Sequence, residues 1–354
     1  MADATFEISR LAAVFGGSGF VGRHIVRALA RRGWRVRVAV RRPDLAGFVE
    51  PDGVVGQVLP VQANLRYPAS IAPTLEGVQM VVNATGVRAE QGAQTFQAVH
   101  VDGAAALARA AKDAGVKAYV HISGIGADAR SPSAYIASKG RGERVTREAY
   151  PDAVILRPSV VFGPEDDFFN RFAALARFLP VIPLFAGGAT RLQPVYAGDV
   201  GRAAAAALDG NAAPGAVYEL GGPDVMTLRA AAELALRTIE RRRVLVGLPL
   251  GPSRLIASLS TFASKATFGR YPKLLTTSRD QVDLLAADNV VSAEAEAEGR
   301  VLRGLGVRPQ AADAVIPTYL VRFRRTGQYE ASAPPDRRKG PYRAGLGEDR
   351  VNRV

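Results

Sequence analysis

The sequence predicts an α/β protein with a doubly wound parallel sheet, followed by a small carboxy-terminal lobe. Three observations lead to this fold class. Short apolar runs alternate with helical patterns through the first half of the chain. The apolar runs are nearly continuous, as expected for strands that are covered on both faces. A glycine-rich stretch at residues 16–22 lies between the first apolar run and the first helical pattern.

The elements of the first half follow from the spacing of apolar residues. Strands are expected at the short apolar runs Leu11–Phe15, Trp34–Val40, Val54–Gln62, Met80–Ala84, Ala118–Ile122 and Ala153–Leu156. Helices are expected where apolar residues recur at helical spacing, from Val21 to Leu29 and over Phe96–Ala114 and Ser133–Tyr150. Such alternation is typical of parallel strands joined by crossover helices.

The second half is less regular. Strands are expected at Ala216–Leu220 and Val244–Leu248, and helices at Val200–Leu208, Thr227–Arg237, Leu250–Phe268 and Ala311–Phe323. We expect the sheet domain to span residues 1–240, the small lobe residues 241–330, and a disordered basic tail residues 331–354. The amphipathic helix at residues 250–268 is interpreted as packing on the sheet domain. The alternative for this helix is contact with a membrane surface or a membrane subunit.

Composition excludes several kinds of chemistry. The 354 residues include no cysteine, which excludes disulfides, thiolate nucleophiles and cysteine-ligated metals. His24, His100 and His121 lack the spacing of a metal-binding pair, so no metal site is expected. The net charge of +13 favours anionic partners, but no nucleic-acid-reading module is present and nucleic acid is not an expected partner.

Targeting signals are also not expected. No segment reaches the roughly 18 uninterrupted apolar residues of a membrane span. Ten residues precede the first predicted strand, which leaves too little room for a signal or transit peptide. We therefore expect a protein that acts where it is made, or one whose presequence has been removed.

The glycine-rich stretch is the first candidate site. It reads Gly16, Gly17, Ser18, Gly19, Phe20, Val21 and Gly22. Glycine lets the backbone turn tightly and approach a pyrophosphate closely, and the helix that follows supplies free N–H groups and a partial positive charge. Because this turn joins a predicted strand to a predicted helix, it predicts a dinucleotide site.

The residues after the second predicted strand bear on the choice of dinucleotide. An acidic residue there binds the ribose of NAD, whereas arginine accommodates the 2′-phosphate of NADP. Arg41 and Arg42 therefore favour NADP, although Asp44 leaves NAD as an alternative.

A tyrosine and a lysine share one face of a predicted helix. Tyr135 and Lys139 are four residues apart, and a lysine ammonium beside a phenol lowers the pKa of the phenol. Tyr135 is then a candidate general acid or base on a carbonyl or an alcohol. Ser123, at the end of a predicted strand, is a candidate to hold the substrate oxygen.

These motifs together resemble the extended or atypical short-chain dehydrogenase/reductase superfamily over roughly residues 9–325. Further segments carry the resemblance: Asn83-Ala84-Thr85-Gly86, Leu156-Arg157-Pro158-Ser159, Phe162-Gly163-Pro164 and Val195-Tyr196-Ala197-Gly198-Asp199-Val200. The resemblance implies a Rossmann-type fold. It also implies cofactor contacts from Asn64, Leu65, Ala84, Thr85, Gly86, Tyr135, Lys139, Pro158 and Val161.

A narrower resemblance is to the nucleotide-binding accessory subunits of respiratory complex I, NADH:ubiquinone oxidoreductase. This resemblance rests on the segments Phe162–Phe172, Gln193–Tyr196 and Leu274–Val291. It implies that the chain binds NADPH and contacts subunits of the peripheral and membrane arms, near the quinone site and the membrane surface. The implied role is structural or regulatory and lies off the electron path. The short leader fits a bacterial member at the cytoplasmic face of the inner membrane.

Some positions depart from the superfamily pattern and leave alternatives open. Asn64 stands where an acid near the adenine is often found, His100 where asparagine is common, and Gly124 where a second serine is common. Because Tyr135 and Lys139 are retained, the rival is an NADP-dependent reductase, epimerase or dehydratase of a nucleotide-sugar, steroid-like or isoprenoid-derived substrate. A third possibility is a regulator in which NADPH occupancy controls a partner.

One acidic cluster is interpreted without a ligand. Glu165, Asp166 and Asp167 precede a helical pattern, where negative charge interacts favourably with the helix dipole.

Overall fold

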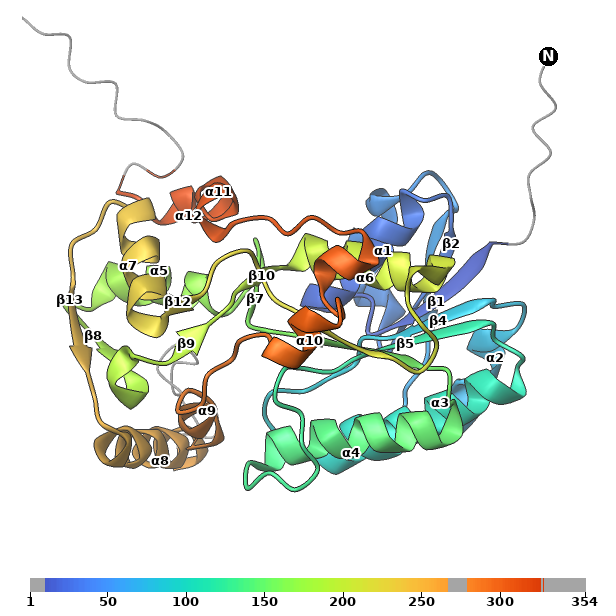
Figure 1. Ribbon diagram of the computed structural model, residues 1–354, viewed down its shortest axis with the longest axis horizontal. Helices are drawn as coiled ribbons and strands as arrows, with labels where there is room; N and C mark the ends of the chain where they lie inside the picture. Colours follow the sequence, from blue (N-terminus) through green and yellow to red (C-terminus); the bar gives the residue numbers. More distant parts are fainter. Residues whose placement is uncertain (1–9, 267–278, 326, 328–354) are drawn as a thin grey trace, which may run out of the picture.

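The computed structural model describes residues 10–266, 279–325 and 327. Within these residues the central sheet is built from β1 (Leu11–Phe15), β2 (Arg35–Val40), β3 (Val58–Gln62), β4 (Met80–Asn83), β5 (Ala118–Ile122), β6 (Val154–Pro158) and β11 (Val217–Leu220). The strand order is β11-β6-β5-β4-β1-β2-β3, and every neighbouring pair in this sheet is parallel. Figure 1 labels β1, β2, β4 and β5 of this sheet. The chain reverses its direction of winding between β1 and β4, which is where doubly wound sheets bind their ligands.

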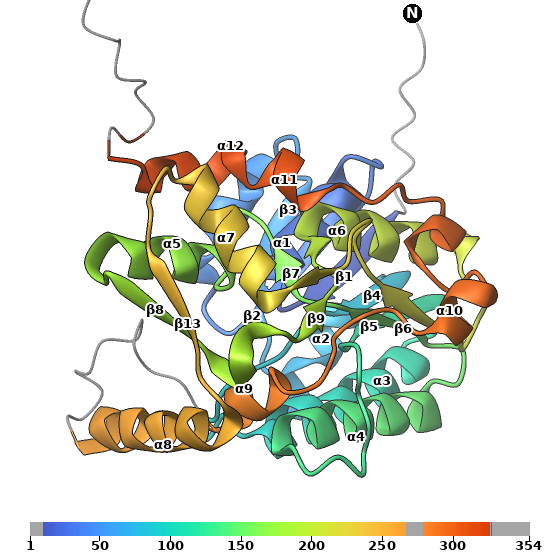
Figure 2. The same ribbon diagram turned by 60° about the vertical axis from the view of Figure 1, so that its left-hand side comes forward.

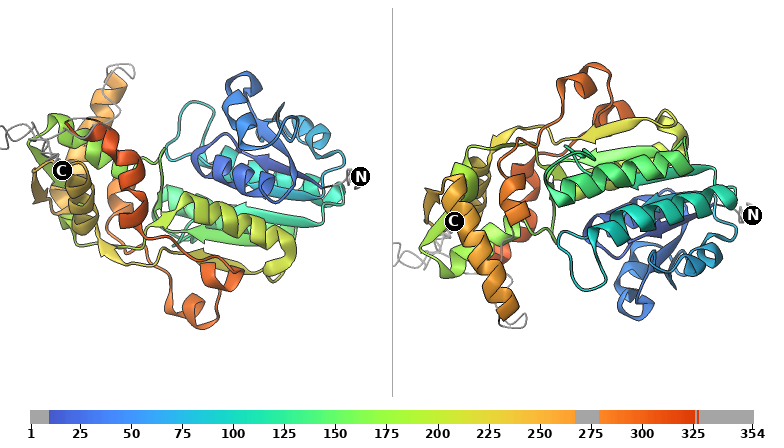
Figure 3. Two further views of the ribbon diagram at one scale, coloured as in Figure 1. Left: turned by 90° about the horizontal axis from the view of Figure 1, so that it is seen from above. Right: turned by 90° about the horizontal axis from the view of Figure 1, so that it is seen from below.

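Helices cover both faces of the sheet (Figure 3). On one face lie α1 (Phe20–Ala30) and α6 (Ala197–Ala206), and on the other lie α2 (Ala72–Leu75), α3 (Gly103–Asp113) and α4 (Ala134–Ala149). Each face has its own apolar core, with Ile25 and Val200 in one and Leu107 in the other. The helices α1 and α6 cross closely because a Cβ at Gly201 would lie 2.4 Å from the carbonyl oxygen of His24.

A third apolar core lies beside the sheet domain and forms the lobe (Figure 2). It is built from α5 (Phe169–Phe178), α7 (Leu228–Thr238), α11 (Ala312–Val315) and α12 (Pro317–Leu320). The parallel pair β8 (Val181–Leu184) and β13 (Val244–Gly247) borders it, and α8 (Leu250–Ala266) packs with α9 (Arg279–Leu284) below. The lobe therefore draws on chain segments from both sides of residue 240.

Shorter elements connect the two parts. The strand β7 (Val161–Phe162) pairs with β10 (Val195–Tyr196), and β9 (Arg191–Leu192) pairs with β12 (Met226–Thr227). The short helix α10 (Ala293–Ala297) lies beside the sheet domain in Figure 1. None of the helices in the described part of the chain has the length and apolar character needed to cross a bilayer.

Most predicted elements are present, with three differences. Val54 and Val55 are exposed residues of a turn, so β3 begins only at Val58. The helix predicted over residues 96–114 begins with a π-helical segment, Gln97–Asp102, before α3. The helix predicted over residues 311–323 is divided, because Pro317 lacks the N–H group that a continuous helix would need there.

Three sequence predictions fall partly or wholly on residues that the structure does not describe. The basic tail at residues 331–354 lies outside the described residues, as do residues 274–278 of the segment Leu274–Val291. The helix predicted to reach residue 268 is described as far as Ala266.

Candidate functional site

A cavity of about 1010 Å³ opens at the carboxyl ends of the sheet strands and extends into the lobe. Twelve of the predicted site residues line it: Gly19, Phe20, Val21, Gly22, Ala84, Thr85, Gly86, Ser123, Tyr135, Lys139, Pro158 and Val161. The other predicted site residues do not line this cavity; they are Gly16, Gly17, Ser18, Arg41, Arg42, Asn64 and Leu65. The predicted site is thus brought together at its phosphate and Tyr135 end, whereas the residues predicted for the adenosine end lie outside the cavity.

The glycine turn has the geometry that a phosphate-binding turn needs. Gly16 has a φ of +78°, and a Cβ there would lie 2.9 Å from the carbonyl oxygen of Ala84. A Cβ at Gly22 would lie only 2.1 Å from the carbonyl oxygen of Gly16, so the start of α1 packs directly on the turn. Gly19 is the N-cap of α1, and no side chain of the described residues caps this helix. Its first N–H groups are therefore available to a phosphate.

The two arginines after β2 lie on the surface and differ in their partners. Arg42 forms an ion pair with Asp44 at 2.7 Å, and this contact lowers the pKa of the Asp44 carboxyl below its usual value. Arg41 is exposed and makes no ion pair with any described residue. Because Asp44 is already paired with Arg42, Arg41 is the better placed of the two cations to meet an added phosphate.

Asn64 and Leu65 organise the turn that follows β3. The Oδ1 atom of Asn64 accepts a hydrogen bond from the backbone N–H of Arg66 at 3.1 Å. Leu65 is buried, and a Cβ at Gly103 would lie 2.8 Å from the Cβ of Leu65. The side chain of Leu65 therefore serves to pack β3 against the start of α3.

The tyrosine and lysine on α4 are both held in the cavity wall, but their electrostatics differ from the prediction. Burial raises the pKa of Tyr135, and the cation that opposes this rise is Arg88. Burial lowers the pKa of Lys139 to about 8, although the charge of Glu143 opposes this shift. The predicted lowering of the Tyr135 pKa by Lys139 is therefore wrong for this structure, because loss of solvent disfavours the phenolate more than nearby cations favour it.

Ser123 is placed as predicted for a residue that contacts a ligand oxygen. It follows β5, its side chain is buried, and it lines the cavity. Its Oγ atom has no hydrogen-bond partner among the described residues. Because a buried hydroxyl without a partner is costly, this atom is suited to a polar group of a ligand.

Two buried histidines support the site and were not predicted as part of it. The N–H of Val87 donates to Nε2 of His100 at 2.9 Å, so Nδ1 carries the proton and donates to Oγ of Ser138 at 2.8 Å. The Nδ1 atom of His121 lies 3.2 Å from Nδ2 of Asn83. Burial, helped by the charge of Lys139, lowers the pKa of each histidine to about 3.

Both histidines are therefore neutral near pH 7, and they fix the backbone that follows β4. The ring of His100 stacks on Phe96 and meets Tyr135 edge to face. The sequence alone does not show that a histidine of this kind is buried in the core. The only available signal was the position of His100, where the superfamily commonly carries asparagine.

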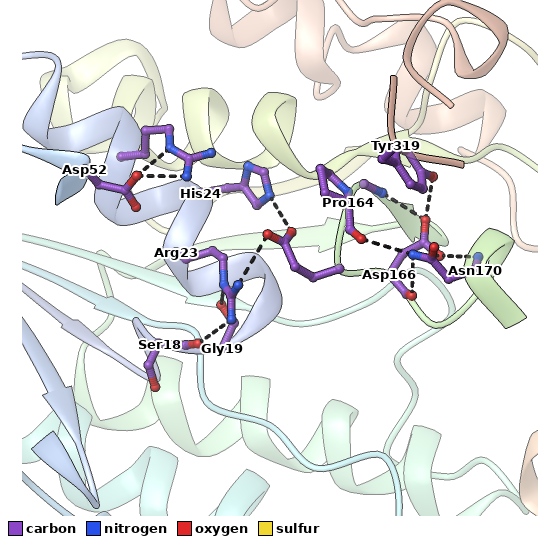
Figure 4. Close-up of polar contacts among 12 residues, drawn as sticks. Ser18, Gly19, Arg23, His24, Asp52, Pro164, Asp166, Asn170 and Tyr319 are labelled. Carbon is purple, nitrogen blue, oxygen red and sulfur yellow. Dashed lines mark hydrogen bonds and ion pairs between the residues drawn. The ribbon is translucent and has the colours of Figure 1, made fainter. Parts of the chain in front are cut away.

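The three residues of the acidic cluster have separate roles, and Figure 4 shows the contacts of Asp166 with Asn170 and Tyr319. Asp166 accepts hydrogen bonds from the N–H of Asn170 at 3.0 Å, near the start of α5, and from the hydroxyl of Tyr319 at 2.7 Å. Glu165 contacts Arg23 at 3.3 Å and His24 at 3.6 Å, both on α1. Asp167 pairs with Arg88.

The predicted interaction with the helix start is thus made by Asp166, whereas Glu165 connects the loop before α5 to the glycine turn. Arg23 also donates to the carbonyl oxygens of Ser18 at 3.1 Å and Gly19 at 3.4 Å. The described residues contain no group of three or more histidine or acidic side chains placed to hold a metal ion.

Comparison with known proteins places this geometry in a family. Residues 12–221 match the model of the NAD dependent epimerase/dehydratase family. The chain is 32% identical over 320 residues to the mitochondrial NADH dehydrogenase (ubiquinone) 1 alpha subcomplex subunit 9 of Arabidopsis thaliana, which covers 90% of this chain and 79% of that protein. It is 37% identical over 175 residues to the ceramide reductase of Caulobacter vibrioides, which covers 49% of this chain and 53% of that protein.

Solved structures agree on the fold. The dTDP-glucose 4,6-dehydratase DesIV from Streptomyces venezuelae, solved with NAD and TYD bound, has a TM-score of 0.64 at 22% identity, over 88% of this chain and 96% of that chain. The predicted Rossmann-type α/β fold and both predicted resemblances are confirmed. The chain belongs to the NAD dependent epimerase/dehydratase family and is a homologue of the alpha subcomplex subunit 9 proteins of NADH dehydrogenase.

Proposed function

We propose that this protein is an NADP(H)-binding accessory subunit of respiratory complex I, with a structural or regulatory role off the electron path. The observation that carries the proposal is the similarity to the Arabidopsis thaliana subunit over 90% of this chain, which includes the lobe as well as the sheet domain. A relative that shared only the dinucleotide-binding half would not support a common place in an assembly.

The glycine turn and the residues around it fit a dinucleotide. The uncapped start of α1 would receive the pyrophosphate, and the exposed Arg41 would meet the 2′-phosphate of NADP. Lys139 would hold the nicotinamide ribose, which supplies a polar partner for its buried ammonium. We therefore propose NADPH rather than NADH as the bound nucleotide.

The proposed role does not require turnover at Tyr135. Its raised pKa keeps the phenol protonated near neutral pH, so it is a poor general base in the unliganded chain. A nucleotide bound only to the folded state stabilises it by mass action, by about 2.7 kcal/mol at a free concentration of 100 times Kd. Nucleotide binding would in this way contribute to the stability of the assembly without any hydride transfer.

We place the protein at the cytoplasmic face of a bacterial inner membrane, against subunits of the peripheral and membrane arms and near the quinone site. The net charge of +13 suits acidic lipid or an acidic protein face. The exposed apolar side chains of α8, including Leu255 and Leu259, supply a surface for such contact.

The test is a pull-down of the affinity-tagged full chain from membranes in mild detergent, followed by mass spectrometry. We expect the complex I subunits in amounts comparable to the bait, and unchanged recovery with Tyr135→Phe. Recovery of the protein without partners would refute the accessory role.

A second candidate function is an NADP-dependent reductase or epimerase, and one observation favours it. The unpartnered Ser123 hydroxyl faces the same cavity as Tyr135, as a carbonyl-binding pair would. The ceramide reductase of Caulobacter vibrioides is a relative whose name carries such an activity. Tyr135→Phe separates the two functions, because an enzyme would lose its turnover while its NADPH binding persisted.

A further inference from the structure

The cavity continues well beyond the dinucleotide site, and its far part is mostly apolar. We call this part the lobe chamber; six half-buried side chains define it, namely Phe168, Phe172, Leu179, Phe185, Leu284 and Leu285. They come from α5 and its two ends, from the residue after β8, and from the end of α9. The total volume of about 1010 Å³ lies at the upper end of the range for small-molecule sites.

The chamber has a polar end and an apolar mouth. At the polar end lie the unpartnered Oγ of Ser123 and the phenol of Tyr135, and both residues line the same cavity. At the opposite end, Ile256 and Leu259 on α8 also line the cavity, yet they are 41% and 59% exposed. Polar side chains such as Arg171 and Ser260 also line the cavity, but a ligand that enters beside α8 would meet mainly apolar side chains on its way to Ser123.

We propose that the lobe chamber binds a single-chain amphiphile with a compact carbonyl or hydroxyl head and a long acyl or isoprenoid tail. The head would lie at Ser123 and Tyr135, and the tail would follow the chamber toward α8. This inference rests on the proposed dinucleotide site only for the position of the polar end. A nucleotide-sugar fits less well, because polar side chains that line the cavity are already engaged with one another: Arg88 pairs with Asp167, and Ser159 donates to Asn289.

Two residues of α8 provide a matched pair for the test. Leu259 lines the cavity and is 59% exposed, whereas Leu255 is 61% exposed and does not line it. A glutamate at either position removes a similar apolar surface from α8. Only Leu259→Glu also places a charge at the mouth of the chamber, so surface adsorption and binding in the chamber are distinguishable.

The experiment titrates the full chain with cis-parinaric acid, a fluorescent single-chain fatty acid, with palmitate, farnesol and UDP-glucose as competitors. We expect saturable binding at one site, displacement by palmitate or farnesol, and no displacement by UDP-glucose. Leu259→Glu should weaken binding at least tenfold, and Leu255→Glu less than twofold. Displacement by palmitate alone or by farnesol alone assigns the tail to the acyl or the isoprenoid class.

Several results would overturn the inference. Binding that does not saturate, equal loss in the two variants, or displacement by UDP-glucose would each exclude an amphiphile in the chamber. NADPH binding is measured by NADPH fluorescence in the same samples, and it should be unchanged in both variants. Loss of NADPH binding with intact parinarate binding would instead refute the proposed cofactor, and recovery of complex I subunits remains a separate measurement.

Discussion

Replacement of Gly22 by alanine should destroy the dinucleotide site more severely than it destabilises the fold. The new Cβ would lie 2.1 Å from the carbonyl oxygen of Gly16 and 2.8 Å from Cα of Gly17. Both neighbours are backbone atoms, so relief requires the start of α1 to move away from the turn by roughly 1 Å. Overpacking of this kind costs about 1–3 kcal/mol.

The same movement displaces the N–H groups that would hold the pyrophosphate. Because a misplacement of about 1 Å costs on the order of 100-fold in a precisely arranged site, we expect NADPH affinity to fall about 100-fold. The melting temperature should fall by several degrees, at roughly 2–4 °C per kcal/mol. Fluorescence titration with NADPH and a thermal melt of the same protein measure the two effects.

Gly251→Ala is the matched control for this prediction. Gly251 lies on α8, and a Cβ there would meet no atom within 4 Å. Alanine in a helix is more stable than glycine by roughly 0.5–1 kcal/mol, so this variant should melt at the same or a slightly higher temperature. If Gly22→Ala binds NADPH within threefold of the native chain, the close approach of α1 to the turn does not create the site.

Three further predictions concern pH, cofactor choice and the lobe. His100 and His121 have pKa values of about 3 in the folded protein and about 6.5 in the unfolded chain. Their contribution to the free energy of unfolding should therefore be complete above pH 6.5 and fall progressively toward pH 3. Urea midpoints measured from pH 7 to pH 4 would show no such slope if these rings were solvated. Arg41→Glu should weaken NADPH binding more than tenfold and NADH binding less than threefold. An equal effect on the binding of both nucleotides would place the 2′-phosphate elsewhere. Asp166→Asn should destabilise the chain by about 1–3 kcal/mol in urea melts, because a buried acceptor of several hydrogen bonds is altered. The exposed Asp313→Asn is its control, and equal midpoints for the two variants would contradict this reasoning.

The sheet domain could be predicted from the sequence because its signals are local. A buried parallel strand such as Leu11–Phe15 is a continuous apolar run, and a glycine turn followed by an amphipathic helix identifies the first crossover. The lobe could not be predicted in the same way. Its core joins Phe169, Ile239 and Ile316, which lie far apart in the sequence, so neither its members nor its limits follow from any local pattern.

The candidate site shows the same division between local and long-range information. Spacing alone places Tyr135 and Lys139 on one face of α4, and in the structure both line one cavity. The direction of the Tyr135 pKa shift depends on burial and on Arg88, which comes from a different part of the chain. A motif thus locates these side chains but does not determine their protonation.

The burial of Lys139 supports the proposed nucleotide site. Its pKa falls from 10.5 to about 8, which corresponds to a cost of roughly 3 kcal/mol for the buried ammonium at neutral pH. Among the described residues, its ammonium donates one hydrogen bond, to the carbonyl oxygen of Ile122 at 3.5 Å, and this long contact offsets little of the cost.

Lys139→Met should therefore stabilise the unliganded chain and weaken its response to NADPH. The gain should be largest below pH 8 and should shrink as the pH rises toward 10.5, because the native lysine then loses its proton in the folded state first. Urea melts with and without NADPH at pH 7 and pH 9.5 measure both effects. An unliganded variant that is less stable than the native chain at pH 7 would show that Lys139 supports the fold by itself. The predicted result would instead explain why a binding protein without turnover keeps this lysine, because a bound ribose hydroxyl would offset part of its cost.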